Sequence, residues 1–362
     1  MSMRITVNKE QKAIYDILLE SSFEPLVTEL ENHGINKRKL CIVSDSNVAN
    51  LYLREVKELL APVCSKVISF VFPAGEENKN LDTVRELYKL LIVNEFDRQD
   101  LLIALGGGVV GDLSGYAAAT YLRGIEFIQV PTTLLSQVDS SIGGKTGVDF
   151  DSYKNMVGAF HQPKLVYMNL CTLKSLPKEQ YFSGMGEIIK HGLIKDASYY
   201  RWLKEHLPEI SARDLGVCRE MIFKSCHTKR QVVENDPLEK GERALLNFGH
   251  TIGHAVEKSM DFQLYHGECV AIGIVGAAYL SYSRGYLTKD ELEDVKNTLQ
   301  RFHLPVSIKG LELVDIVETM KHDKKMDSGR IRFILLKTIG CAYIEKNVTQ
   351  KELEAAVASI QK

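Results

Sequence analysis

The stretch LLIALGGGVVGDLSG, residues 101–115, decides the fold of the N-terminal half of the chain. Its first seven residues, LLIALGG, predict a buried β-strand, and a helical pattern follows directly. Gly106, Gly108 and Gly111 satisfy the GxGxxG pattern, whose glycines let backbone amides and the start of a helix approach a pyrophosphate. A tight strand-to-helix turn without a ligand is the alternative that this motif leaves open.

The segments around this stretch alternate between short apolar runs and amphipathic helices. The apolar runs predict strands over 39–45, 66–73 and 125–133, and the amphipathic segments predict helices over 47–60 and 81–96. Strand–helix alternation of this kind indicates a parallel sheet with helices on both faces. We therefore expect an N-terminal domain of the α/β class.

The pattern changes near Leu173 to Pro177. From there on, helices are predicted over 175–196, 213–235, 269–280 and 291–302, and the next strand only over 331–340. We therefore expect an α/β domain over residues 1–173 and a mainly helical domain over residues 174–362. The cleft between two such domains is the expected position of the site.

Composition excludes several classes of partner. Lys and Arg number 45 and Asp and Glu 47, so the formal net charge is −2. The sequence also lacks the basic tail that would indicate a nucleic-acid partner. The start, MSMRITVNKE, lacks the apolar core of a signal peptide, and the apolar run at 269–280 is too short to span a membrane. Seven scattered cysteines without a CxxC pattern are typical of reduced thiols, so we expect a cytoplasmic protein.

Two further loops support a dinucleotide site. The segment PTTLLSQVDSSIGGKTGVDF (131–150) gathers hydroxyl residues, including Thr132 and Thr133, and glycines around Lys145, and FPAGEENKN (72–80) adds a glycine turn with Lys79. Glu126, about 20 residues after the first glycine, stands near the start of a strand and so does not suit the ribose. Asp45, at the end of a predicted strand, is the better ribose candidate.

The C-terminal half holds candidates for a metal site. Catalytic zinc sites usually take three protein ligands from His, Asp, Glu and Cys, and here the candidates are Glu187, His191, His250, His254 and His266. On a helix His250 and His254 face the same side, whereas His266 stands just before an apolar helix. Spacing alone does not separate a site with His250 and His254 from one with His250 and His266.

Basic residues occur in or beside all of these segments. Such a group, near metal and NAD motifs, indicates a phosphorylated and carboxylated substrate, although any single lysine could belong to a solvated face. Arg243 and Asn247 are four residues apart, directly before His250, and we expect both to point into the same cleft. The basic residues are Lys145, Lys154, Lys190, Lys229, Arg243, Lys324 and Lys325.

A resemblance covers nearly the whole chain. The motifs GGGVVGD, RGIEFIQVPTTLLSQVDSSIGGKTGV, GMGEIIKHG, LNFGHTIGHAVE, YHGECVAIG and HDKK, in that order, resemble the 3-dehydroquinate synthase family. The resemblance implies a Rossmann-like domain followed by a helical metal domain, usually in a homodimer. It also implies conversion of 3-deoxy-D-arabino-heptulosonate 7-phosphate to 3-dehydroquinate and phosphate, in the shikimate pathway to aromatic amino acids. That reaction proceeds by transient NAD-dependent oxidation, phosphate elimination, reduction and intramolecular aldol closure.

The resemblance also assigns residues. It implies that Glu187, His250 and His266 bind zinc, for which cobalt or ferrous iron could substitute in such a site, while His254 faces the substrate. Ala74 departs from the family, which commonly has an acidic residue there. The implied NAD contacts are Gly75, Glu76, Lys79, Gly108, Val109, Val110, Gly111, Asp112, Thr132, Thr133, Lys145, Lys154, Thr172, Leu173 and Ser175. The implied substrate contacts are Asp139, Lys145, Asn155, Lys190, Lys229, Arg243, Asn247, His254, one lysine of HDKK (Lys324 in preference to Lys325) and, across the dimer interface, Arg123.

Three alternatives stand beside this interpretation. Another sugar phosphate cyclase, such as 2-deoxy-scyllo-inosose synthase, would tend to lack GGKT, to carry an acidic residue in place of Asn247 and to break the DKK motif. A metal-dependent NAD alcohol or glycerol dehydrogenase would not require the set Lys229, Arg243 and Asn247. A non-catalytic NAD-binding module would not retain every candidate ligand and anion-binding group.

Overall fold

The computed structural model describes residues 3–151, 153–239, 241–261, 263–324 and 333–361. The chain divides into two compact units, unit 1 over Met1–Leu176 and unit 2 over Pro177–Lys362. Each unit is described by itself.

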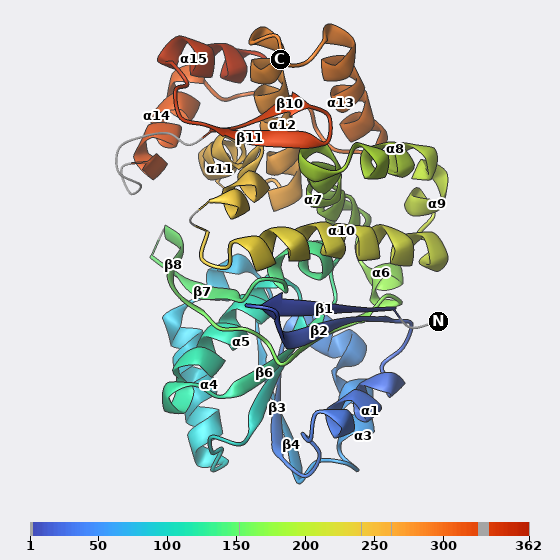
Figure 1. The fold of residues 1–362 in the computed structure, drawn as a ribbon. Coiled ribbons are helices and arrows are strands. Elements are labelled where there is room, and N and C mark those ends of the chain that lie inside the picture. Colours follow the sequence, from blue (N-terminus) through green and yellow to red (C-terminus); the bar gives the residue numbers. More distant parts are fainter. Residues whose placement is uncertain (1–2, 152, 240, 262, 325–332, 362) are drawn as a thin grey trace. The chain divides into compact units, whose positions relative to one another are not determined.

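Unit 1 is built on a seven-stranded sheet in the order β1-β2-β9-β6-β5-β3-β4 (Figure 1). All neighbouring strands pair in parallel except β1 and β2, which form an antiparallel hairpin at one edge. The strands are β1 (Met3–Lys9), β2 (Lys12–Glu20), β3 (Lys39–Asp45), β4 (Lys66–Phe72), β5 (Leu101–Gly106), β6 (Glu126–Pro131) and β9 (Leu165–Asn169).

The central strand β5 shows why this half folds as predicted. Its alternate residues face two different cores: Leu102 and Ala104 pack on one face of the sheet, and Leu101 and Ile103 on the other. Helices α4 (Leu81–Val93) and α5 (Gly108–Thr120) cover the first face, and α1 (Glu24–Asn32) and α3 (Arg54–Leu60) cover the second (Figure 1). The expected parallel sheet with helices on both faces is confirmed.

The segment 131–150 is only partly the loop that its composition suggests. After a π-helical turn (Ser136–Ser140), the chain forms strand β7 (Lys145–Phe150), which pairs with β8 (Tyr153–Phe160) in a separate two-stranded sheet. The glycines of the segment hide this strand, because Gly147 and Gly158 pack so closely that a Cβ on Gly147 would lie 2.9 Å from the carbonyl oxygen of Val157. Small residues here serve strand packing rather than flexibility.

Unit 2 is mainly helical, as expected. A small sheet of β10 (Phe333–Thr338) and β11 (Cys341–Glu345) corresponds to the strand predicted over 331–340, whose first two residues lie outside the described ranges. Helix α12 is buried along nearly its whole length and packs against α7 and α11. The helices are α7 (Lys178–Lys195), α8 (Ala197–Glu205), α9 (Leu207–Ser211), α10 (Leu215–Asn235), α11 (His250–Ser259), α12 (His266–Ser283), α13 (Lys289–Arg301), α14 (Leu313–Lys324) and α15 (Gln350–Ala358).

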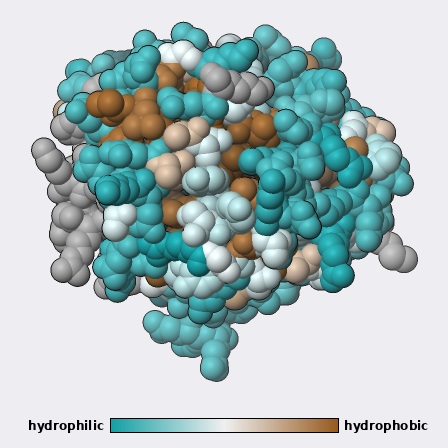
Figure 2. Space-filling model, turned by 90° about the horizontal axis from the view of Figure 1, so that it is seen from above, coloured by the Kyte–Doolittle hydropathy of each residue, from teal (hydrophilic) through white to brown (hydrophobic). Residues whose placement is uncertain are grey.

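In the view of Figure 2, hydrophilic residues surround a few groups of exposed hydrophobic residues. Scattered exposed apolar side chains of this kind are ordinary on globular proteins. Among the described residues, none of the helices combines the length and the apolar character needed to cross a membrane.

Candidate active site

The topology of unit 1 marks one position on the sheet. Strand β3 lies between β4 and β5, so the chain adds strands first on one side of β3 and then on the other. In open parallel sheets, ligands bind at the carboxyl ends of the strands where the strand order reverses in this way. Asp45 ends β3 and Gly106 ends β5, so the ribose candidate and the glycine motif stand at the same end of neighbouring strands.

The glycine motif forms the turn that the sequence predicts. Gly107 caps helix α5, so Gly108 to Asp112 make up its first turns, and the backbone amides there suit an anion. Gly111 has no room for a side chain, because a Cβ would lie 2.7 Å from Oε1 of Gln129 on β6. At the end of β3, Oδ1 of Asp45 accepts the N–H groups of Asn47 and Val48 at 2.8 and 3.0 Å and thereby caps the following helix.

Neighbouring loops are tied to this turn. The N–H of Thr132 donates to the carbonyl oxygen of Gly106 at 2.9 Å, which joins the ends of β6 and β5. Thr172 begins the short helix α6 (Thr172–Ser175), and its hydroxyl accepts from Nε2 of Gln137 at 3.3 Å. The hydroxyl groups of Ser175 and Tyr52 are hydrogen-bonded. Residues from four segments far apart in the sequence therefore meet at the carboxyl end of one sheet.

Lys79 is the centre of a polar cluster in unit 1. We call Lys79 with Glu76, Asp112, Asp149 and Asn155 the lysine cluster. The side chain of Lys79 is 3% exposed. Its Nζ lies 2.7 Å from Oε1 of Glu76 and 2.9 Å from Oδ1 of Asn155. The carboxylates of Asp149 and Asp112 lie 3.5 and 3.6 Å from the same nitrogen.

Electrostatics in the lysine cluster follow from this burial. Burial alone would lower the pKa of Lys79, but Asp112, Glu76 and Asp149 together raise it above its ordinary value, so the ammonium stays charged. Burial, with Glu76 and Asp139 adding like charge, raises the pKa of Asp112 to about 7 against the opposing effect of Lys79. The predicted cofactor residues Glu76, Lys79 and Asp112 are thus joined in one cluster with the predicted substrate residue Asn155.

The other predicted residues of unit 1 occupy nearby strands and turns. Lys145 is the first residue of β7, Lys154 lies on β8, and Asp139 is in the π-helical turn before β7. Arg123 stands apart from the lysine cluster in sequence, in a turn where Leu122, Arg123 and Gly124 all have positive φ (49, 69 and 121°). A backbone of this kind is costly for the two non-glycine residues and is often found at functional sites.

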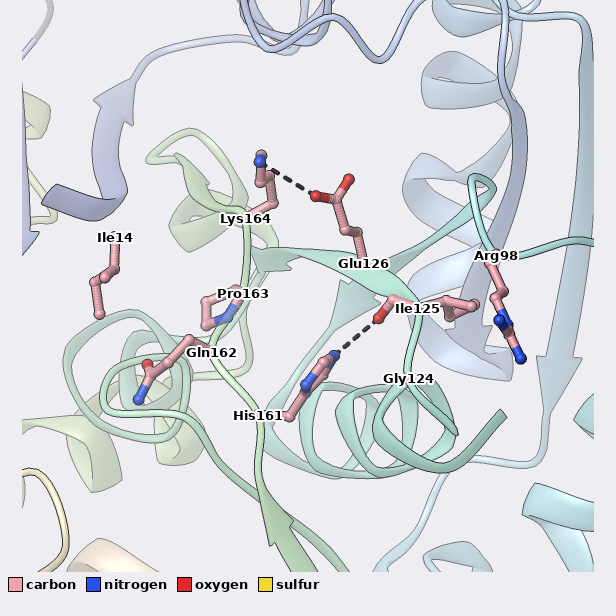
Figure 3. A pocket seen from close by; sticks show the side chains of 9 residues that line it. All are labelled: Ile14, Arg98, Gly124, Ile125, Glu126, His161, Gln162, Pro163 and Lys164. Atoms are coloured by element: carbon pink, nitrogen blue, oxygen red, sulfur yellow. Dashed lines mark hydrogen bonds and ion pairs between the residues drawn. The ribbon is translucent and has the colours of Figure 1, made fainter. Parts of the chain in front are cut away.

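A cavity of about 320 Å³ lies beside this turn (Figure 3). Its lining includes Glu126, which pairs with Lys164 at 3.1 Å, and His161, whose Nε2 is 2.8 Å from the carbonyl oxygen of Ile125. Glu126 begins β6, so the cavity belongs to the amino end of the strand, opposite to the carboxyl ends where ligands bind in parallel sheets. We assign no part of the candidate site to it.

Three helices of unit 2 bring the predicted metal ligands together. Glu187 lies in the middle of α7 and is fully buried, while His250 and His266 are the first residues of α11 and α12. Their ligand atoms all lie within 4.8 Å of one another. We call Glu187, His250 and His266 the metal cluster.

Glycines beside the ligands allow this approach. A Cβ on Gly186 would lie 2.5 Å from the carbonyl oxygen of Gly267, so α7 and α12 pack backbone to backbone where Glu187 and His266 begin to converge. Gly249 has a φ of +81°, and a Cβ there would lie 2.9 Å from the carbonyl oxygen of Val270 on α12. The motifs GMGE, FGH and HG therefore encode helix contacts as well as ligands.

The spacing of the metal cluster fits a bound ion better than direct hydrogen bonds. Nε2 of His250 and Nε2 of His266 both lie 3.5 Å from Oε1 of Glu187, which is too long for a strong hydrogen bond. A tetrahedral metal with bonds of about 2.1 Å keeps its ligand atoms about 3.4 Å apart. Oε1 of Glu187 is also buried, and no hydrogen bond to it is found among the described residues.

The second nitrogen of each histidine has an orienting oxygen. Nδ1 of His250 is at hydrogen-bond distance, 3.2 Å, from the carbonyl oxygen of Phe248, whereas Nδ1 of His266 faces Oε2 of Glu257 at 3.7 Å, the distance of an ion pair. Outer oxygens of this kind fix the tautomer and the ring orientation of metal-binding histidines. Glu257 was missed in the sequence analysis, although it lies seven residues after His250 on the same helix face.

A second ligand group shares a histidine with the first. His254, Glu257 and His266 also lie close enough to hold a metal ion. Because Nε2 of His266 faces Glu187 and Nδ1 faces Glu257, one ring cannot direct both nitrogens at a single ion. The equal 3.5 Å distances favour the set with Glu187, which leaves Glu257 to orient His266.

Charges converge on Glu187. Burial alone would raise its pKa, but Lys190, His250 and His266 hold it well below the usual value. Burial and the nearby Lys190 lower the pKa of His250 well below its ordinary value. Burial opposes protonation of His266, but Glu187 and Glu257 raise its pKa to about 10.

The remaining predicted residues of unit 2 lie around these helices. Lys190 is one turn after Glu187 and pairs with it, and the ring of His254 lies 5.1 Å from that of His250. Lys229 is buried on α10, and Arg243 and Asn247 lie in a 3-10 turn before α11. Arg243 donates to the carbonyl oxygen of Pro237, and Asn247 to Glu239. The side chain of Lys324 and the whole of Lys325 lie outside the described residues.

Comparisons with known proteins agree with this geometry. A solved structure of a 2-epi-5-epi-valiolone synthase from Streptomyces hygroscopicus subsp. jinggangensis, with NAD+ and Zn2+ bound, is 28% identical with a TM-score of 0.89 and matches 99% of both chains. The fold is that of the sugar phosphate cyclases, with a parallel sheet covered by helices and a second, helical part. The family models for the N-terminal and C-terminal parts of 3-dehydroquinate synthase match residues 69–183 and 184–326.

Two curated relatives extend this match. A 3-dehydroquinate synthase from Acetivibrio thermocellus is 42% identical over 333 residues, which is 92% of each chain. One from Psychrobacter cryohalolentis is 46% identical over 311 residues, 86% of this chain and 84% of the relative. The chain belongs to the 3-dehydroquinate synthase family, so the resemblance noted in its motifs is confirmed.

Proposed function

We propose that this protein converts 3-deoxy-D-arabino-heptulosonate 7-phosphate to 3-dehydroquinate and phosphate. It would use NAD and a divalent metal ion, zinc in preference to cobalt. The observation that carries the proposal is the metal cluster, three ligands spaced for one ion in a chain of this family. The three sequence features that favour this enzyme over the related cyclases, namely GGKT, Asn247 and DKK, are all present.

The two units would divide the work. Residues 1–173 would bind NAD through the first turns of α5 and the loops beside it, and residues 174–362 would hold the metal through Glu187, His250 and His266. When bound, NAD would supply a reversible hydride acceptor and the metal would polarise the hydroxyl that is oxidised. Because the hydride returns within one cycle, no NADH would accumulate.

The chain's own groups would bind the anions and move protons. Lys145 and Arg243, and the NH2 group of Asn155, would donate hydrogen bonds to the substrate phosphate and carboxylate, while His254 stands next to the metal cluster and could transfer protons. Buried Lys190 and Lys229 would add positive charge. These groups suit an elimination of phosphate better than a simple polyol oxidation.

Assembly and location are part of the proposal. We infer a homodimer in which Arg123, in its turn of positive φ, reaches the phosphate bound by the other subunit. We also infer a cytoplasmic protein, since all seven cysteines, each within the described residues, are free thiols.

The test is to follow phosphate release from 3-deoxy-D-arabino-heptulosonate 7-phosphate with trace NAD and zinc, while absorbance reports NADH. We expect stoichiometric phosphate and 3-dehydroquinate without NADH. Turnover of glucose 6-phosphate instead would assign the chain to the related cyclases. Steady NADH formation from a simple polyol would contradict both assignments and indicate a dehydrogenase.

A further inference from the structure

Asp149, at the end of β7, makes more contacts within the lysine cluster than its place in a hairpin requires. Its N–H donates to the carbonyl oxygen of Lys79 at 2.8 Å, so β7 is joined to the loop after β4. Its Oδ1 accepts the N–H of Asn155 at 2.8 Å and lies 3.5 Å from Nζ of Lys79. The side chain is 15% exposed. A single carboxylate oxygen therefore faces both residues.

The hairpin explains why Asn155 needs this oxygen. Val148 pairs with Val157 and Phe150 with Tyr153, so one residue of β7 stands opposite three residues of β8. Such a bulge takes its extra residues out of the ladder and leaves their N–H groups without a strand partner. Asn155 lies in this bulge with a φ of 54°, a left-handed conformation that asparagine tolerates. Asp149 supplies the acceptor that the ladder does not.

Lys79 then fixes the side chain of the same residue. Its Nζ lies 2.9 Å from Oδ1 of Asn155. A lysine ammonium only donates, so the amide oxygen must face Lys79 and the NH2 group must point the other way. Asn155 thus presents N–H donors, which suit an anionic group such as a phosphate or a carboxylate.

We propose that Asp149 is a positioning residue, which holds the backbone of Asn155 in the bulge so that Lys79 can turn its amide donors toward an anionic group of the substrate. The proposal rests on the proposed function, in which Asn155 contacts the substrate. It assigns Asp149 no direct contact with the substrate or the reacting atoms. Its effect on KM for the sugar acid is therefore expected to pass through Asn155, whereas any effect through Lys79 would appear in NAD affinity and in the melting temperature.

A double-mutant cycle tests this dependence. The variants are Asp149→Ala, Asn155→Ala and their combination, with Asp149→Asn as the conservative change and Asp151→Asn, an exposed acid in the same turn, as the matched control. The readouts are KM and kcat for phosphate release, NAD affinity by fluorescence titration, and the melting temperature of each variant.

We expect Asp149→Ala to raise KM for the sugar acid about 10- to 100-fold, because a misplaced donor loses its contact with the anion. In the Asn155→Ala background the same change should alter KM by less than about twofold. Asp149→Asn keeps an oxygen acceptor, so it should restore most of the loss, and it also serves if Asp149→Ala does not fold. The Asp151→Asn control should match the wild type in KM and in NAD affinity.

Two outcomes would overturn the inference while the proposed function stands. In both, the wild type releases phosphate. In the first, Asp149→Ala and Asp149→Asn leave KM for the sugar acid unchanged. In the second, Asp149→Ala raises KM by the same factor whether or not Asn155 is present. No phosphate release by the wild type would instead defeat the proposed function, and this inference would fall with it.

Discussion

The lysine cluster of unit 1 buries one lysine against three carboxylates, whereas the metal cluster of unit 2 brings two histidines to one buried carboxylate. Lys79 faces three carboxylates and donates at 2.7 and 2.9 Å to Glu76 and Asn155. In the metal cluster one carboxylate, Glu187, faces two histidines at 3.5 Å. The residues of the lysine cluster are hydrogen-bonded to one another, whereas the ligand atoms of the metal cluster are spaced to hold a metal ion between them.

This difference teaches what each cluster contributes. Direct hydrogen bonds in a buried network hold their members in one arrangement, so the lysine cluster would fix the loops before a ligand arrives. Ligand atoms held at metal-bonded distances carry an uncompensated cost until an ion joins them. We therefore expect changes in the metal cluster to remove function first, and changes in the lysine cluster to affect stability as well.

The largest effect should come from Glu187→Gln. The amide is a poor metal ligand, and the loss of the carboxylate removes the group on which His250 and His266 converge. We expect phosphate release to fall by at least about 10³-fold, because metal polarisation is worth several kcal/mol. Metal content of the purified protein, measured by mass spectrometry, should fall in parallel.

Glu179→Gln is the matched control, since Glu179 is exposed in the first turn of the same helix. It should leave turnover and metal content unchanged. If Glu187→Gln retained both a full complement of metal and wild-type turnover, the ligand set would be wrong, and the alternative group of His254, Glu257 and His266 would take its place.

The second effect should come from Lys79→Met, which removes the centre of the lysine cluster. Three carboxylates would then lose their common counter-ion, and breaking a buried ion pair in this way typically costs about 3 kcal/mol. We expect a lower free energy of unfolding in urea, together with weaker NAD binding. Circular dichroism and a fluorescence titration measure the two quantities.

Lys89→Met is a suitable comparison, because Lys89 is exposed and pairs only at the surface with Glu86 at 2.5 Å. Surface pairs contribute little, so this variant should unfold like the wild type. Lys79→Met could instead abolish NAD binding without changing the free energy of unfolding. Lys79 would then contact the cofactor directly, and the lysine cluster would not have the stabilising role given to it here.

Periodicity and motifs predicted most of the framework from the sequence. LLIALGG is a continuous apolar run, and successive residues of a strand face opposite sides of the sheet. Leu102 and Ile103 accordingly lie in different cores, so the run is enough to predict a strand covered on both faces. The β7–β8 hairpin was not predicted, because its glycines are typical of loops. The sequence of one strand also does not indicate which other segment it pairs with.

The candidate site was also predicted only in part from the sequence. Spacing predicted that His250 and His254 share a helix face, but it left the third ligand open, because Glu187 and His266 reach the cluster through packing of α7 and α12. Glu257 and Asp149 were missed for a related reason. Each acts on a residue brought near by the fold, and a single carboxylate on a strand or helix has no distinctive sequence pattern of its own.

The smallest effect should appear in the pH dependence of stability, through Asp112. Its pKa in the folded chain is raised to about 7, from 3.8 for an ordinary aspartate, because burial and the neighbouring Glu76 and Asp139 outweigh Lys79. A carboxyl group of this kind binds a proton on folding. Its contribution to stability is full below pH 3.8 and is lost as the pH rises through about 7.

Asp112→Asn removes this proton uptake and should therefore flatten the pH profile. We expect the melting temperature of the wild type to fall between pH 5 and pH 8 by about 3 °C more than that of the variant. Asp82→Asn, at an exposed position in the first turn of α4, should behave like the wild type. Parallel profiles for the wild type and Asp112→Asn would mean that Asp112 is ionised throughout, with Lys79 compensating its charge fully. The lysine cluster would then hold three full negative charges around one positive charge, and its stability would depend on Lys79 even more strongly than the distances indicate.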